Sequence, residues 1–98
     1  MEKDLLLKSR DEIDKIDTEI LKLFEKRMSV VGDIAKYKFE NNMEIFVPER
    51  EILMKQKNVA KLNNTELKEY YEELLNTFLT VSKNYQKKII EDIKKVGE

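Results

Sequence analysis

The sequence contains no cysteine and no histidine among its 98 residues. Without cysteine, disulfide bonds, thiol nucleophiles and thiolate metal sites are excluded. Without histidine, the commonest general base and metal ligand is missing as well. Any reaction at this chain therefore proceeds without either side chain, and we expect neither a metal ion nor another cofactor.

Turn-forming residues are also scarce, with two glycines and one proline in the whole sequence. So few of them leave little room for hairpins and tight turns, which favours a few long helices. Charged residues make up 40% and hydrophobic residues 41% of the chain, as amphipathic helices require. The composition therefore predicts a single all-α domain over residues 1–98.

The chain has neither an excess of charge of one sign nor a long apolar run. Its 19 basic and 20 acidic residues are interspersed, so we expect no face that binds nucleic acid. Three consecutive leucines near the N-terminus are too short a run for a signal peptide or a membrane span. We expect a cytoplasmic protein that binds neither nucleic acid nor membrane.

The positions of apolar and capping residues predict three helices, long, short and long. The first begins near Asp4 or Ser9 and ends near Glu40, where two asparagines follow. Pro48 suits the first position of the second helix, which runs to about Leu62. Asn63 and Glu66 are spaced as a cap and its partner at the start of the third helix, which runs to about Lys95.

Polar side chains interrupt the apolar stripes of both long helices. Arg27 and Lys38 continue the stripe of the first helix; they differ by about 20° around its axis and by roughly 16 Å along it. Ser82 and Gln86 interrupt the stripe of the last helix and lie one turn apart. The apolar stripe of the first helix consists of Ile13, Ile16, Ile20, Leu23, Phe24, Val31, Ile34 and Ala35.

Taken singly, these residues have simpler interpretations. The stems of Arg27 and Lys38 could cover the stripe while their charges reach water, and Ser82 could bond to the backbone carbonyl one turn earlier. Taken together they are harder to dismiss, because the last stripe carries no carboxylate between Leu74 and Ile89. Buried cations need anionic partners, so the pattern predicts an anionic ligand.

Arg10 approaches the first stripe from its other end. It lies about 25 Å from Arg27 along the helix, so one small ligand cannot easily touch both in a single chain. A helix of roughly 50 Å also exceeds the diameter of a compact domain of this size. Both observations favour oligomerisation.

The spacing of these residues resembles that of the all-helical chorismate mutases, over essentially the whole chain. The resemblance implies an intertwined homodimer in which each of two sites receives one arginine from the other subunit. It also implies an isomerase that converts the dianion chorismate to prephenate in phenylalanine and tyrosine synthesis. The residues that carry it are Leu7, Arg10, Ile13, Ile16-Asp17, Ile20, Leu23, Lys26-Arg27, Ile34-Ala35, Lys38, Pro48-Glu49-Arg50-Glu51 and Ser82-x-x-x-Gln86.

The resemblance further implies a role for each candidate residue. Arg27 and, from the partner subunit, Arg10 bind the two carboxylates of chorismate. Lys38 and Gln86 are the catalytic donors to the ether oxygen. The remaining contacts come from Glu51 and the backbone at Val47, which hold the ring hydroxyl, and from Arg50 and Ser82, which complete the polar lining.

Val47 departs from the family pattern, because many members have aspartate there. The related isochorismate pyruvate lyases have an apolar residue at that place, whereas Glu51 favours the mutase. A lyase is therefore one alternative. The other is a non-catalytic helical dimer that binds aromatic-pathway metabolites. The mutase reaction itself is a unimolecular Claisen rearrangement and needs no proton transfer, nucleophile or metal, which agrees with the composition.

Overall fold

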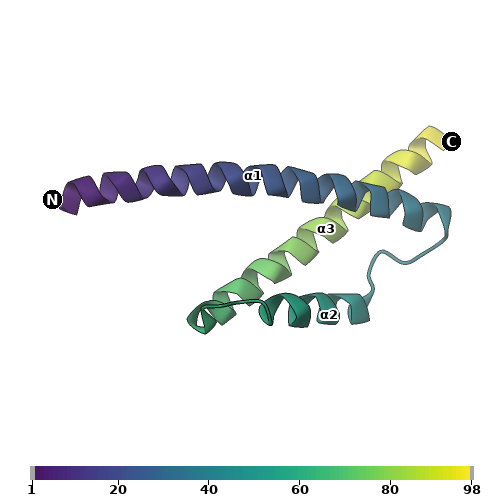
Figure 1. Cartoon of the computed structure of the whole chain (residues 1–98). Coiled ribbons are helices and arrows are strands. Elements are labelled where there is room, and N and C mark those ends of the chain that lie inside the picture. The colour runs from purple at the N-terminus through teal and green to yellow at the C-terminus, as the bar shows by residue number, and fades with distance from the viewer. Residues whose placement is uncertain (1, 98) are drawn as a thin grey trace. The chain divides into compact units, whose positions relative to one another are not determined.

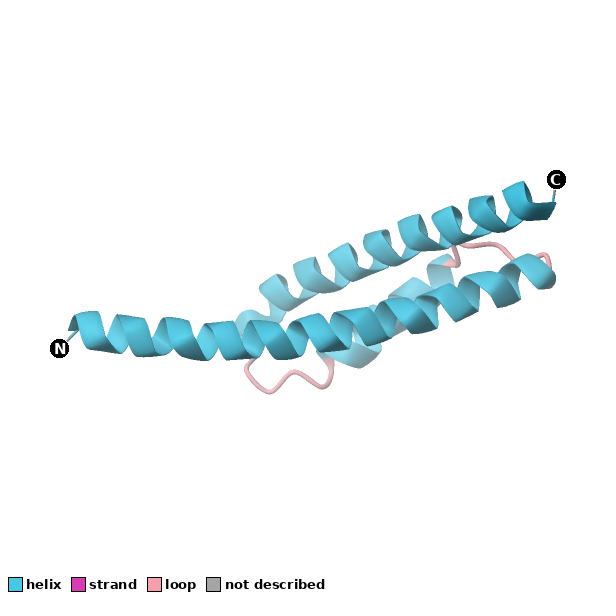
Figure 2. Cartoon of the chain, turned by 90° about the horizontal axis from the view of Figure 1, so that it is seen from above, coloured by secondary structure: helices cyan, strands magenta, loops and turns pink. Residues whose placement is uncertain are grey.

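A computed structural model describes residues 2–97, and all regular elements in that range are helices (Figure 2). The long, short and long helices are α1, Glu2–Glu40; α2, Pro48–Val59; and α3, Lys68–Gly97, which follows a short 3-10 helix, η1, at Thr65–Leu67. The predicted all-α class and the order of the helices are confirmed. None of these helices is both long and apolar enough to cross a membrane.

The chain divides into two units between Val30 and Val31. The first unit is the part of α1 that ends at Val30. It carries the part of the apolar stripe from Ile13 to Phe24, and four of the side chains there, Ile13, Ile16, Ile20 and Leu23, are each more than half exposed. This stripe therefore has a large apolar area in contact with solvent.

The second unit begins at Val31 and contains the end of α1, α2, η1 and α3. Its apolar core is small and consists of Val31, Ala35 and Leu75. Gly32 faces the ring of Tyr85, and a Cβ atom added to it would lie 3.6 Å from that ring, an ordinary contact. α2 and α3 lie side by side and are joined by residues 60–67 (Figure 1).

The end of α1 is set by its two asparagines, as predicted. Asn42 has a positive φ of 54°, the left-handed conformation that commonly ends a helix. The amide of Met43 donates to the carbonyl of Lys38 over 2.8 Å, and that of Asn42 donates to the carbonyl of Phe39 over 3.4 Å. These two bonds form a Schellman motif, which turns the chain away from the helix axis.

The start of α2 also follows the prediction. Pro48 occupies the first turn, and Val47 before it is extended, with φ −126° and ψ 92°. Its carbonyl accepts from the amides of Arg50 and Glu51, over 3.0 and 3.2 Å. The side chain of Val47 supplies no cap, so α2 begins without the side-chain hydrogen bond that most helices have.

The second break differs from the prediction in its details. α2 ends at Val59, before Leu62, and α3 is preceded by the 3-10 turn. The capping residue is Asn64 and not Asn63, because the backbone at Asn64 is extended and its side-chain oxygen accepts from the amide of Glu66 over 3.1 Å. The helical segment thus begins one residue later than the spacing indicates.

Candidate functional site

Ser82 and Gln86 are the two buried polar side chains in the part of the chain that the structure describes, each 7% exposed. Their spacing of one turn places them on the same face of α3. The hydroxyl of Ser82 donates to the carbonyl of Phe78 over 2.7 Å, the bond to the preceding turn that its sequence position allows.

Gln86 differs from Ser82, because its side-chain oxygen Oε1 is buried and has no hydrogen-bond partner among residues 2–97. A buried amide oxygen without a partner is unfavourable by roughly 1–3 kcal/mol. Such groups are few in native proteins, and each calls for an explanation. The amide carries this acceptor beside an NH₂ donor group, so a polar ligand that both donates and accepts hydrogen bonds is one such explanation.

Lys38 lies in the last turn of α1 and is half-buried. Its ammonium donates to the carbonyl oxygen of Ile45, in the loop before α2, over 2.8 Å. Burial lowers the pKa of Lys38 below its ordinary value, and the negative charge of Glu51 opposes that shift. The end of α1, the following loop and the start of α2 are thereby brought together around this ammonium group.

Glu51 lies in the first turn of α2, where a negative charge is favourable. Its side chain is only 19% exposed, and its carboxylate oxygen Oε2 lies 3.0 Å from the ammonium nitrogen of Lys83 on α3. The same nitrogen lies 4.6 Å from the centre of the Phe46 ring. Glu51 therefore has a positive neighbour on α3 and a second one in Lys38 on α1.

The predicted site residues fall in both units of the chain. The second unit contains Lys38, Val47, Arg50, Glu51, Ser82 and Gln86. Among these, the structure brings Lys38 near Glu51 and sets Ser82 beside Gln86 on α3, whereas Arg50 is exposed. Arg10 and Arg27 belong to the first unit, in which Arg10 is exposed and Arg27 half-buried.

Two groups near these residues were not predicted. Lys83 follows Ser82 directly, and a lysine beside an apolar stripe is typical of a solvated position, so its contact with Glu51 has no local signal. The carbonyl of Ile45 is a backbone group, which residue type does not reveal. The apolar run before Pro48 indicates only that this loop packs against something.

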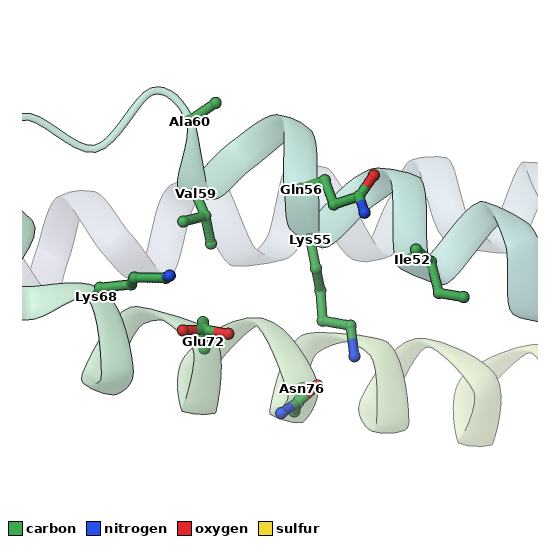
Figure 3. A pocket seen from close by; sticks show the side chains of 8 residues that line it. All are labelled: Ile52, Lys55, Gln56, Val59, Ala60, Lys68, Glu72 and Asn76. Atoms are coloured by element: carbon green, nitrogen blue, oxygen red, sulfur yellow. The ribbon is translucent and has the colours of Figure 1, made fainter.

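A separate groove lies between α2 and α3, with a volume of about 520 Å³ (Figure 3). In Figure 3, Lys55 extends from α2 toward Asn76 on α3. None of the predicted site residues lines this groove. Its walls are formed by Ile52, Lys55, Gln56, Val59, Ala60, Lys68, Glu72 and Asn76.

The side chains of the candidate site define what it can do. It offers an ammonium group, a buried amide and a carboxylate held by a lysine. Across residues 2–97, carboxylates do not gather in a group able to hold a metal ion. Such a set suits recognition of a polar, anionic molecule and stabilisation of developing negative charge, not proton relay.

These features define an all-helical protein with buried or half-buried polar side chains on α1, α2 and α3. The chain belongs to the family described as chorismate mutase type II, whose model matches residues 9–87. This match confirms the resemblance found in the sequence.

Relatives include larger proteins. The chain is 41% identical over 86 residues to a bifunctional chorismate mutase/prephenate dehydratase of Buchnera aphidicola subsp. Acyrthosiphon pisum, covering 87% of this chain and 22% of that protein. It is 45% identical over 47 residues to the T-protein of Haemophilus influenzae, covering 48% of this chain and 12% of that protein. It thus spans less than a quarter of either relative. No solved structure matches the chain significantly.

Proposed function

We propose that this protein is a chorismate mutase, an isomerase that converts chorismate to prephenate in the synthesis of phenylalanine and tyrosine. The observation that carries the proposal is the family match over residues 9–87. It is supported by the donor set of the second unit, above all the half-buried ammonium of Lys38 and the buried amide of Gln86. A dianionic substrate fits a site rich in cations and amides.

The reaction requires the protein to select a conformation and to stabilise charge. Chorismate rearranges when its enolpyruvyl side chain folds over the ring, so that a carbon–carbon bond forms as the ether carbon–oxygen bond breaks. Arg27 and the partner subunit's Arg10 bind the two carboxylates and hold that compact conformer, which lowers the entropic part of the barrier. Negative charge grows on the ether oxygen, and Lys38 and Gln86 donate to it.

The remaining residues orient the ring. Glu51 and the backbone at Val47 hold its hydroxyl group, while Arg50 and Ser82 complete the polar lining. All of these residues bind the substrate and position its ring, and none exchanges a proton with it. This division of labour agrees with a chain that has neither histidine nor cysteine.

We further propose that residues 1–98 act as one domain of an intertwined homodimer. The support comes from α1, where Ile13, Ile16, Ile20 and Leu23 are each more than half exposed although they form one apolar stripe. A second copy of the helix covers such a stripe without any further partner. It also brings one arginine of each chain to the site of the other, which accounts for the separation between Arg10 and Arg27.

The proposal is tested with purified protein and chorismate, by following the loss of chorismate absorbance and identifying prephenate in the product. A Lys38→Ala protein purified in parallel shows whether a mutase from the expression host contributes. Prephenate formed by the wild-type protein and not by the variant supports the proposal. The second candidate is an isochorismate pyruvate lyase, because Val47 is apolar. Release of pyruvate from isochorismate without turnover of chorismate would establish the lyase activity instead.

A further inference from the structure

Lys83 has no part in the proposed mechanism, yet it contacts two segments that carry site residues. It follows Ser82 on α3, and its side chain is 27% exposed. Its ammonium nitrogen lies 3.0 Å from Oε2 of Glu51, in the first turn of α2. It also lies 4.6 Å from the centre of the Phe46 ring, in the loop before α2. One side chain of α3 therefore reaches both the loop and α2.

This ion pair differs in kind from others in the chain. Lys22 pairs with Glu19, and Lys88 pairs with Asp92, each within one helix and with side chains about half or more exposed. Exposed pairs of that sort contribute little. The side chain of Glu51 is mostly buried, and the partner of its carboxylate comes from another helix. An ion pair that joins two helices in this way also fixes the position of its carboxylate.

Glu51 also lies within electrostatic reach of Lys38. Without Lys83, the carboxylate would still be attracted by Lys38 and would be free to move toward it. The ring hydroxyl of the substrate would then lose its acceptor, and Lys38 would be engaged by a carboxylate. The ion pair with Lys83 holds Glu51 from the side of α3.

We propose that Lys83 is a positioning residue: its ammonium group, seated on Phe46, fixes the Glu51 carboxylate in the orientation that receives the ring hydroxyl of the substrate. This inference rests on the proposed function, because the hydroxyl is that of chorismate. Lys83 itself does not touch the substrate. Its effect is therefore transmitted through Glu51 and disappears when Glu51 can no longer form the ion pair.

The test is steady-state kinetics with chorismate for Lys83→Met, Lys83→Arg, Glu51→Gln and the double variant with Lys83→Met and Glu51→Gln. Methionine keeps the apolar stem and removes the charge. A hydroxyl contact present in both ground state and transition state governs mainly KM, so Lys83→Met raises KM roughly tenfold and changes kcat less than about threefold. Lys83→Arg retains most of the wild-type value. In the Glu51→Gln background, Lys83→Met changes KM less than about twofold.

The matched control is Lys88→Met, the same change on the same helix in an exposed pair, which leaves KM and kcat at wild-type values. The proposal would be overturned if Lys83→Met changed KM equally in the wild-type protein and in Glu51→Gln. It would also be overturned if Lys83→Met lowered kcat and the melting temperature while KM stayed unchanged, because that result indicates a purely structural role. Inactive wild-type protein would count against the proposed function instead. In that case, the dissociation constants of chorismate for the wild-type protein and the same four variants are measured by calorimetry. The positioning role would be overturned if chorismate did not bind, or if Lys83→Met weakened binding equally in the wild-type protein and in the Glu51→Gln background.

Discussion

The ammonium group of Lys38 donates to the carbonyl oxygen of Ile45 over 2.8 Å and so connects the last turn of α1 to the loop before α2. The donor is half-buried, and its bond to this backbone carbonyl orients it. Little reorganisation is then needed when charge develops nearby, which is the condition under which a fixed donor accelerates a reaction most. Lys38 is for this reason the residue whose loss is expected to reduce catalysis most directly.

Lys38→Ala should lower kcat by about 10²- to 10³-fold, the usual effect of removing one donor to a developing oxyanion. Helix content should remain at the wild-type level, because the backbone motif that ends α1 does not use this side chain. The measurement is steady-state turnover of chorismate together with circular dichroism. Lys36→Ala, an exposed lysine on the same helix, is the matched control and should turn over at the wild-type rate. Full activity of Lys38→Ala would show that Lys38 does not donate to the ether oxygen in the transition state.

Gln86→Leu should separate stability from activity. Leucine has a similar size and removes a buried oxygen that has no partner among residues 2–97, so the free energy of unfolding should rise by about 1 kcal/mol. Turnover of chorismate should fall about 10²-fold, because the donor to the ether oxygen is lost. Urea unfolding without ligand measures the first effect, and kinetics measure the second. Gln56→Leu makes the same change at an exposed position and should give no gain in stability. A less stable Gln86→Leu protein would show that the amide is satisfied in the native state.

The pH dependence of kcat/KM should show the environment of Lys38. Burial lowers its pKa, and the charged form is the active one, so kcat/KM should fall with rising pH through a pKa below that of an ordinary lysine. Glu51 opposes this shift, so Glu51→Gln should move the alkaline limb to still lower pH. The carboxylates of chorismate titrate far below this range and do not interfere. An alkaline limb that stays in place in Glu51→Gln would show that another group controls it.

Much of this arrangement could be predicted from the sequence, because it depends on local signals. Asn42 adopts the left-handed conformation that ends α1, and Pro48 begins α2, as their residue types indicate. The i, i+4 spacing of Ser82 and Gln86 predicted a shared face, and both are buried. The helix ends near 59–68 were predicted less well, since two adjacent asparagines offer the same cap and only the backbone conformation selects Asn64.

The contacts around Glu51 could not be predicted in the same way. Its pairing with Lys83 joins residues on different helices, and each residue taken alone has the pattern of a solvated charge. The simpler interpretation of Ser82 was also partly right, since its hydroxyl bonds to Phe78 on the same helix. Sequence spacing therefore located the polar face of α3 that carries Ser82 and Gln86. The ion pair between Glu51 and Lys83 depends instead on how α2 and α3 pack.

Val47→Asp should stabilise the protein and increase its activity. Val47 is at the N-cap of α2 and provides no side-chain hydrogen bond, so a carboxylate there should add about 1 kcal/mol to the free energy of unfolding. Asparagine caps a helix as well as aspartate but carries no charge, which makes Val47→Asn the matched control. If the carboxylate also assists the substrate, Val47→Asp should raise kcat/KM several-fold and Val47→Asn should not. Equal activity in both variants and the wild type would show that the position affects stability alone.

Mixing an Arg10→Ala protein with an Arg27→Ala protein should restore activity that neither has by itself. In a heterodimer, one site receives Arg27 from the first chain and Arg10 from the second, while the other site lacks both. Random exchange makes about half of the dimers mixed, so about a quarter of the wild-type activity should return.

The matched control for this mixing experiment combines Arg10→Ala with a chain that carries both substitutions, which cannot assemble an intact site. Native mass spectrometry establishes that the chains have exchanged. Heterodimers without recovered activity would show that Arg10 does not act across the subunit boundary. Recovery in the test mixture and not in the control would instead assign the two carboxylates of the substrate to arginines from different chains, which is why a helix as long as α1 is required.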